Sequence, residues 1–164
     1  MGINADLNLS STDTITVAMW LKPSLLGGTY PILNDSDSVT SLGWVTYIQP
    51  DTAWCAQNRS TSATHERTQC SATGLISVDQ WVFLSAVIYP DATLPKTYVN
   101  GALTAGASVT TGTPTQLYSS AYNVMIGRRS SGSGNYFLGL VDDVRVYRRE
   151  LSATEILRLY NNTR

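Results

Sequence analysis

Hydrophobic and polar residues alternate over short runs along most of the chain, a pattern typical of β-strands that bury one face. These runs are rich in β-branched and aromatic residues, and Gly, Pro, Asn or Asp separates them. The pattern predicts strands in the segments Thr14–Pro23, Tyr30–Asp35, Gly43–Gln49, Thr52–Arg59, His65–Ala72, Gln80–Tyr89, Lys96–Ala105, Asn123–Arg129 and Tyr136–Arg148.

Two of these segments carry more specific signals. Gln80–Tyr89 is almost continuously apolar, so we expect this strand to be covered on both faces. Lys96–Ala105 contains Asn100-Gly101, the pair that best fits a two-residue hairpin turn. The Gly- and Ser-rich segment Arg128–Tyr136 indicates a surface loop.

Only the C-terminal end has the pattern of a helix. Ser152 is placed as an N-cap and Glu155 follows three residues later, which is the spacing of a capping box. Ile156, Leu159 and Tyr160 then share one face of the predicted helix. We therefore expect this helix to pack on a sheet.

Many short strands and one terminal helix predict an all-β fold, a sandwich of two antiparallel sheets. The chain has 164 residues, a suitable length for one domain, and shows no internal repeat. We predict a single domain over residues 1–164. The polar start after Met1-Gly2 suggests that this domain was excised from a larger protein.

The low charge and the short apolar runs argue against two classes of partner, nucleic acids and membranes. The net charge is −1 and 14% of the residues are charged, so no basic surface for nucleic acid is indicated. No apolar run approaches the roughly 18–20 residues that span a bilayer. We expect neither nucleic acid nor membrane as a partner.

The two cysteines bracket a predicted hairpin. Cys55 and Cys70 lie at equal distances from its midpoint, between Ser62 and Ala63, so they would face each other across two strands. Opposed Cβ atoms lie roughly 4.5–5.5 Å apart, close to disulfide geometry. We predict a disulfide, which favours an extracellular or cell-surface location, over two unrelated free thiols.

Three segments together resemble a known family. Thr14–Pro23, Gln80–Leu103 and Asn123–Ile156 are similar to the opening strand, the "WHHVAVVYDG…LYVNG" pair and the closing "GxIDDVRIYNRALSAEEI" of concanavalin A-like, laminin-G-like domains. Val82-Phe83 and Glu150 depart from that pattern. The resemblance implies a jelly-roll sandwich used mostly as a non-catalytic binding or adhesion module of extracellular proteins.

The closing strand contains Asp142, Asp143 and Arg145. Alternation along a regular strand predicts that Asp142 and Asp143 point to opposite faces, which argues against a glycosidase pair. The similar strand of laminarinase-type β-glucanases implies that Asp142 binds a structural calcium ion; the alternative is a carboxylate that accepts backbone amides. We expect Asp143 and Arg145 to form a salt bridge.

Catalysis is not indicated. The catalytic relatives on this fold carry alternating carboxylates on one strand, whereas the three glutamates here, Glu66, Glu150 and Glu155, stand apart. His65 is the single histidine and is expected at a solvated hairpin. We therefore expect a domain that is not an enzyme.

Candidate ligand-binding residues come from the middle region. Sugar sites combine aromatic surfaces with polar side chains, and the residues of these types are Trp44, Tyr47, Gln49, Trp54, Asn58 and Arg59. Core packing is an equal alternative for Trp44 and Trp54, whereas the resemblance places Trp20 and Trp81 in the core. Asp35 and Asp37 could bind calcium in a loop, although ordinary Asx turns would explain them equally well.

Three functions remain open at this stage. The first is a carbohydrate-binding, lectin-like module that binds a glycan or polysaccharide. The second is an adhesion or structural module that binds a protein. The third, which the positions of the glutamates disfavour, is a polysaccharide hydrolase or lyase. We favour the first.

Overall fold

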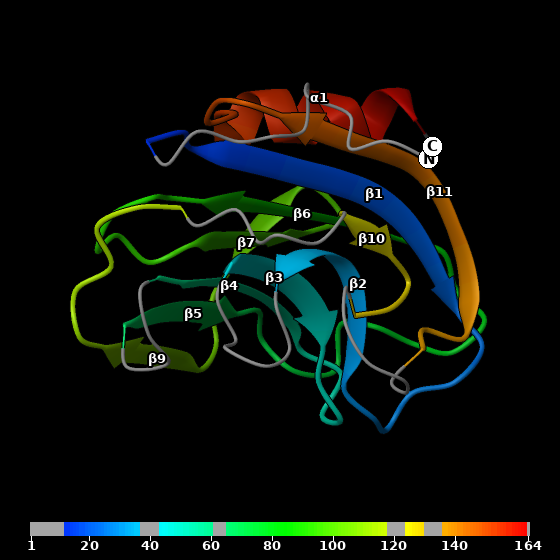
Figure 1. Cartoon of the computed structure of the whole chain (residues 1–164). Helices are drawn as coiled ribbons and strands as arrows, with labels where there is room; N and C mark the ends of the chain where they lie inside the picture. Colours follow the sequence, from blue (N-terminus) through cyan, green and yellow to red (C-terminus); the bar gives the residue numbers. More distant parts are fainter. Residues whose placement is uncertain (1–11, 37–42, 61–64, 118–123, 130–135, 164) are drawn as a thin grey trace.

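The computed structural model describes residues 12–36, 43–60, 65–117, 124–129 and 136–163. It consists of two antiparallel sheets and one C-terminal helix, as predicted (Figure 1). The elements are β1 (Ile15–Pro23), β2 (Tyr30–Ser36), β3 (Gly43–Ile48), β4 (Trp54–Arg59), β5 (Glu66–Cys70), β6 (Val82–Ile88), β7 (Lys96–Val99), β8 (Ala102–Thr104), β9 (Ser108–Thr111), β10 (Met125–Ile126), β11 (Gly139–Tyr147) and α1 (Ala153–Asn162).

The strand order mixes segments from both ends of the chain. The five-stranded sheet has the order β11-β1-β6-β7-β8, so the first and last strands pair with each other. The six-stranded sheet has the order β10-β2-β3-β4-β5-β9. No described helix is long and apolar enough to cross a membrane.

The main core lies between the two sheets. Alternate residues of β1, including Ile15, Val17 and Met19, are fully buried there and contact side chains from the six-stranded sheet. The indole Nε1 of Trp54 donates a hydrogen bond to the Ser85 carbonyl oxygen over 3.2 Å, which joins β4 to β6 across the sandwich. Apolar packing, with this hydrogen bond, thus joins the two sheets.

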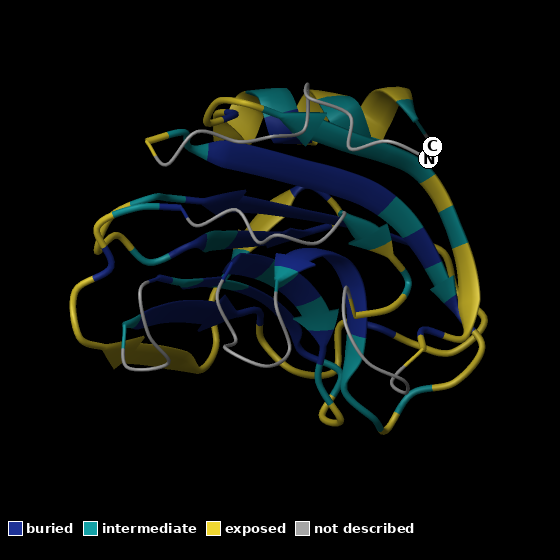
Figure 2. Ribbon diagram, in the orientation of Figure 1, coloured by how far each residue is buried: buried dark blue, intermediate teal, exposed yellow. Residues whose placement is uncertain are grey.

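The helix covers the outer face of the five-stranded sheet (Figure 1). Ile156 is fully buried against Phe83 and Val87 of β6, in a second apolar cluster that Leu159 and Tyr160 complete. Every residue of β6 is therefore buried, as the continuous apolar run predicted (Figure 2). Ser152 and Glu155 form the predicted capping box.

The hairpins also form as predicted. Asn100 and Gly101 link β7 to β8, with φ angles of 51° and 79° that suit these two residue types. Cys55 and Cys70 lie directly opposite each other on β4 and β5 and form a disulfide. The predicted hairpin midpoint, and most of the Gly- and Ser-rich segment, lie outside the described residues.

Candidate functional site

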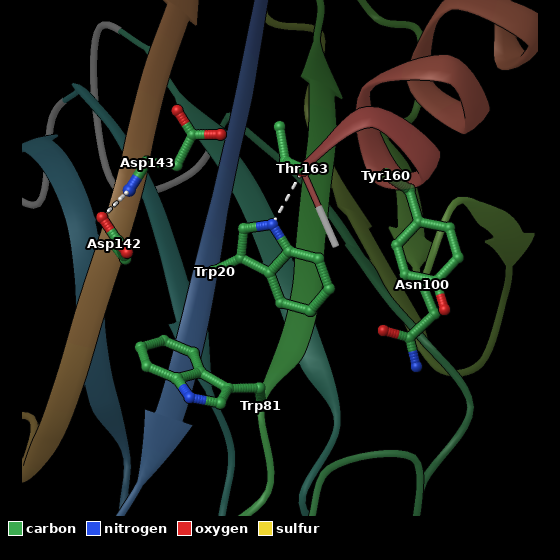
Figure 3. A pocket seen from close by; sticks show the side chains of 7 residues that line it. All are labelled: Trp20, Trp81, Asn100, Asp142, Asp143, Tyr160 and Thr163. Carbon is green, nitrogen blue, oxygen red and sulfur yellow. Dashed lines mark hydrogen bonds between the residues drawn. The ribbon is translucent and has the colours of Figure 1, made fainter.

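A cavity of about 530 Å³ lies on the outer face of the five-stranded sheet, beside the end of α1 (Figure 3). Two tryptophans, two carboxylates, an amide, a phenol and a hydroxyl line it: Trp20, Trp81, Asp142, Asp143, Asn100, Tyr160 and Thr163. The mixture of aromatic rings and hydrogen-bonding groups is that of a small-molecule or sugar site.

The register of the sheet assembles this lining from distant parts of the sequence. Trp20 of β1 lies opposite Asp142 of β11 on one side and Phe83 of β6 on the other. The Phe83 amide donates a hydrogen bond to Asn100 Oδ1 over 3.0 Å, and this contact fixes the turn residue at the rim. Figure 3 shows the aspartates on one side of Trp20 and Asn100 on the other.

Aromatic packing orients Trp20. Its ring centroid lies 5.5 Å from that of Phe83 and 5.8 Å from that of Tyr160. Its Nε1 donates to Thr163 Oγ1 over 2.8 Å, so the indole N–H is already used within the protein. Trp81, immediately before β6, keeps 44% of its surface exposed.

The expectation that both tryptophans belong to the core is therefore wrong for Trp81 and holds only in part for Trp20. Trp20 is half-buried, on the outer face rather than between the sheets. Trp20 lies directly opposite Phe83, and Trp81 precedes Phe83 by two residues. Strand alternation therefore places both tryptophans on the same outer face as Phe83.

A β-bulge places both aspartates at the cavity, which corrects the prediction that they face opposite sides. Ala18 pairs with Arg145 and Trp20 with Asp142, so Asp143 and Val144 together face the single residue Met19. Asp143 takes a φ of 49° at the irregularity. Val144 therefore turns to the core, and Asp143 lines the cavity together with Asp142.

The two carboxylates have different partners. Asp143 Oδ1 accepts a hydrogen bond from Arg145 Nε at 2.8 Å, which confirms the predicted salt bridge. The Asp143 carboxylate raises the pKa of the Arg145 guanidinium further. Asp142 Oδ1 accepts the Asp143 backbone N–H at 2.8 Å, and Asp142 makes no ion pair with any described residue.

The middle-region candidates do not form a single surface. Trp44, Trp54 and Asn58 are at most 1% exposed and point between the sheets, so the interpretation of these side chains as an exposed sugar platform is corrected. Asn58 Nδ2 donates to the Tyr89 carbonyl oxygen over 2.9 Å. The alternative reading, core packing, holds for both tryptophans.

Tyr47 and Arg59 lie on the opposite face of β3 and β4, the outer face of the six-stranded sheet. Tyr47 packs against the disulfide, and burial raises the pKa of its phenol. Arg59 Nη2 contacts Glu66 Oε2 at 2.5 Å. Gln49, which follows β3, is half-buried on the same side as Tyr47.

The predicted calcium ligands lie in separate places. Asp35 is 2% exposed on β2, opposite Trp44, whereas Asp142 is exposed on the other sheet. Asp37 lies outside the described residues. No group of three His, Cys, Asp or Glu occurs among the described residues. The carboxylate oxygens of Asp142 and Asp143 suit calcium chemically, with water or carbonyl ligands completing the shell. Calcium stays a prediction.

The glutamates are engaged in structural contacts. Glu66 accepts hydrogen bonds from Arg59, Gln57 and Thr68. Glu150 Oε1 accepts from Lys96 Nζ at 2.7 Å. Glu155 serves the capping box, and its pKa is lowered to about 2 by Arg149 and by Ser152.

Of the residues that line the cavity, the sequence predicted only Asp142 as a site residue. Those not predicted are Trp20, Trp81, Asn100, Asp143, Tyr160 and Thr163. The available signal for Asn100 was its place at the hairpin turn, which fixes the side chain at the end of the sheet. For Trp81, the sign was its even spacing from Phe83 at the start of a strand. No feature of the sequence indicated the β-bulge at Asp143.

The family follows from the sequence itself. The sequence profile of the Laminin_G_3 family, described as the concanavalin A-like lectin/glucanases superfamily, matches residues 2–157. The chain belongs to this superfamily. No curated protein sequence matches it.

Solved structures share the fold at low sequence identity. The CBM40 module of the Ruminococcus gnavus IT-sialidase, bound to α2,3-sialyllactose, is 16% identical with a TM-score of 0.72, over 92% of this chain and 83% of that one. The heptameric SAP-like pentraxin from Limulus polyphemus is 18% identical with a TM-score of 0.65, over 93% and 71%. The binding domain of botulinum neurotoxin serotype C1 is 14% identical with a TM-score of 0.65; the match covers 93% of this chain but 37% of that one. These similarities establish a lectin-like fold.

Proposed function

We propose that this domain is a non-catalytic carbohydrate-binding module and that its glycan binds in the cavity around Trp20 and Trp81. The cavity itself carries the proposal: about 530 Å³ of space lined by one exposed indole, one half-buried indole, two carboxylates, an amide, a phenol and a hydroxyl. Sugar rings have apolar C–H faces that stack on indoles, and hydroxyl groups that need hydrogen-bonding partners.

The polar groups at the rim are suited to hydroxyls. Asn100 Oδ1 is held by the Phe83 amide, which leaves the Nδ2 group to donate. The Asp142 carboxylate has acceptor capacity beyond the single backbone N–H that it accepts. The proposed site thus offers the Asn100 donor on one side of the Trp20 ring and the Asp142 acceptor on the other.

A matched pair of variants tests the proposal on a glycan array. Trp81→Ala removes the exposed indole of the cavity, and Tyr136→Ala removes a phenol that is 50% exposed elsewhere. We expect the wild type and Tyr136→Ala to bind the same glycans and Trp81→Ala to lose at least ~10-fold in affinity, because stacking is lost. Equal binding by all three proteins would place the ligand elsewhere.

A second measurement tests for catalysis, because Asp142 and Asp143 share the cavity and two carboxylates can cleave a glycosidic bond. A glycan that binds is incubated with the protein and recovered, and its reducing ends are counted. We expect an intact glycan. Release of new ends by the wild type, but not by Asp142→Asn, would establish a hydrolase instead.

A protein-binding module is the second candidate. Leu140 of the edge strand β11 is 58% exposed, and Leu138, just before this strand, is 50% exposed, a surface that could receive a protein partner. This function would be favoured if the domain bound no glycan but bound a partner protein, and if Leu140→Asp abolished that protein binding.

An extracellular setting and a structural calcium ion complete the proposal. The disulfide supports an oxidising location. Melting temperatures in calcium and in EDTA, for the wild type and Asp142→Ala, test the metal. A lower melting temperature of the wild type in EDTA than in calcium, absent in Asp142→Ala, would support calcium at Asp142. Equal melting temperatures of the wild type in the two buffers would contradict the calcium site.

A further inference from the structure

We infer that the cavity selects a sugar bearing a free ammonium group, such as a glucosamine unit of a de-N-acetylated glycan. This inference rests on the proposed function, because it names the ligand class of the same site. It is carried by the charges and the aromatic rings that surround the space.

Among the described residues, the charges at the cavity are of one sign. Asp142 and Asp143 are its charged lining residues, and no described basic side chain lines it. Arg145 balances Asp143 through the 2.8 Å contact, but Asp142 has no ion pair among the described residues. Within this part of the chain, the negative charge of Asp142 is available to a ligand. An ammonium group would form a charge-assisted hydrogen bond with it.

The tryptophans favour the same charge. An ammonium near an indole face is attracted by the ring quadrupole, and Trp is the best side chain for this interaction. The Nε1 of Trp20 is bound to Thr163, so this residue offers the ligand its ring and not a donor. Trp81 adds a second, exposed ring.

Two cations lie near the cavity without entering its lining. Arg145 shares the outer face of β11 with Asp142, and its guanidinium Nε is bound to Asp143. Lys22 lies two positions after Trp20 on β1, opposite Leu140, and makes no ion pair with a described residue. An acidic sugar would meet Asp142 unfavourably, and an N-acetylated sugar would leave its charge unmet.

A matched pair of ligands tests the inference. The glucosamine hexamer and the N-acetylglucosamine hexamer differ at the 2-position alone, as ammonium or acetamide. Isothermal titration at about pH 5.5 keeps the sugar amine protonated. The net charge of the chain, −1 at pH 7, is then close to zero, which limits nonspecific attraction. EDTA excludes divalent cations, and a lysine pentamer serves as a polycation without a sugar ring.

We expect the glucosamine hexamer to bind at least ~10-fold more tightly than its acetylated counterpart, and the lysine pentamer not to compete. Asp142→Asn should reduce the preference to less than ~3-fold, chiefly because binding of the glucosamine hexamer weakens. Asp51→Asn is the control, because Asp51 also accepts a backbone N–H but lies in a turn of the other sheet.

The outcomes separate the inference from the proposed function. Equal or tighter binding of the acetylated hexamer would overturn the inference and keep a glycan-binding module. A preference that survives in Asp142→Asn would also overturn it, because the charge would lie elsewhere. Binding of no glycan, here or on the array, would remove the proposed function itself. Competition by the lysine pentamer would show that the cavity binds any polycation, which would overturn selection of a sugar.

Discussion

The outer faces of the two sheets use polar side chains in different ways. On the six-stranded sheet, Glu66 accepts hydrogen bonds from Gln57 at 2.7 Å and Thr68 at 2.6 Å, besides its contact with Arg59. These groups satisfy one another, and the Glu66 side chain is 11% exposed. Such a network stabilises a surface and leaves a ligand little to bind.

The five-stranded sheet leaves its polar groups facing an open space. Trp81 Nε1 and Asn100 Nδ2 donate to no described residue, and Asp142 accepts a single backbone N–H. Helix α1 covers one part of this face and stops beside Trp20, so the cavity forms where the cover ends. Polar composition alone therefore does not mark a site; unused hydrogen-bonding capacity next to open volume does.

Loss of the disulfide is expected to have the largest effect on stability and almost none on glycan binding. Replacing both cysteines, Cys55→Ala with Cys70→Ala, removes a cross-link between residues 15 apart in sequence. For a loop of this size we expect a loss of about 3 kcal/mol in the free energy of unfolding. Urea unfolding measures it, and glycan affinity at the cavity should change less than ~2-fold.

The wild type under reducing conditions should match this double variant, whose own stability should not respond to the reductant. A loss of glycan affinity in the folded variant would contradict the separation of the two faces, because the disulfide lies on the six-stranded sheet.

The next effect is expected at Glu66. Burial alone would raise the pKa of this carboxyl, but hydrogen bonds from Thr68, Arg59 and Gln57 outweigh burial and lower the pKa below its ordinary value of 4.5. The network therefore contributes stability above about pH 4.5, and this contribution is lost as the pH falls through the folded-state pKa. Glu66→Gln should cost about 1–2 kcal/mol at pH 7 and progressively less in acid.

Glu150→Gln provides the matched control for Glu66→Gln. Glu150 also pairs with a cation, Lys96, but both side chains are more than 40% exposed. We expect a change within about 0.5 kcal/mol at pH 7. Urea unfolding of the three proteins between pH 7 and pH 3 compares them. A cost for Glu66→Gln that stays constant, or grows in acid, would exclude the network as its source.

The sequence predicted most of the fold because most elements had a local signal; β9 was not predicted. Alternation marked the strands, Asn100-Gly101 the hairpin, and Ser152 with Glu155 the capping box. The site was predicted poorly, because its geometry depends on register between distant strands. Alternation placed Asp142 and Asp143 on opposite faces, and a bulge opposite Met19 brought them to one cavity. Residue type suggested Trp44 for a surface, whereas its parity on β3 directed it inward.

The smallest effect is expected at Tyr47, a residue that the sequence proposed for ligand binding. Tyr47→Phe removes the phenolic hydroxyl and keeps the ring that packs against the disulfide. Because the proposed site lies on the other sheet, glycan affinity should change less than ~2-fold and the free energy of unfolding by about 0.5 kcal/mol or less. Isothermal titration beside Trp81→Ala gives the comparison. If Tyr47→Phe lost ~10-fold in affinity and Trp81→Ala none, the glycan would bind on the six-stranded sheet, and the roles of the two faces would be exchanged.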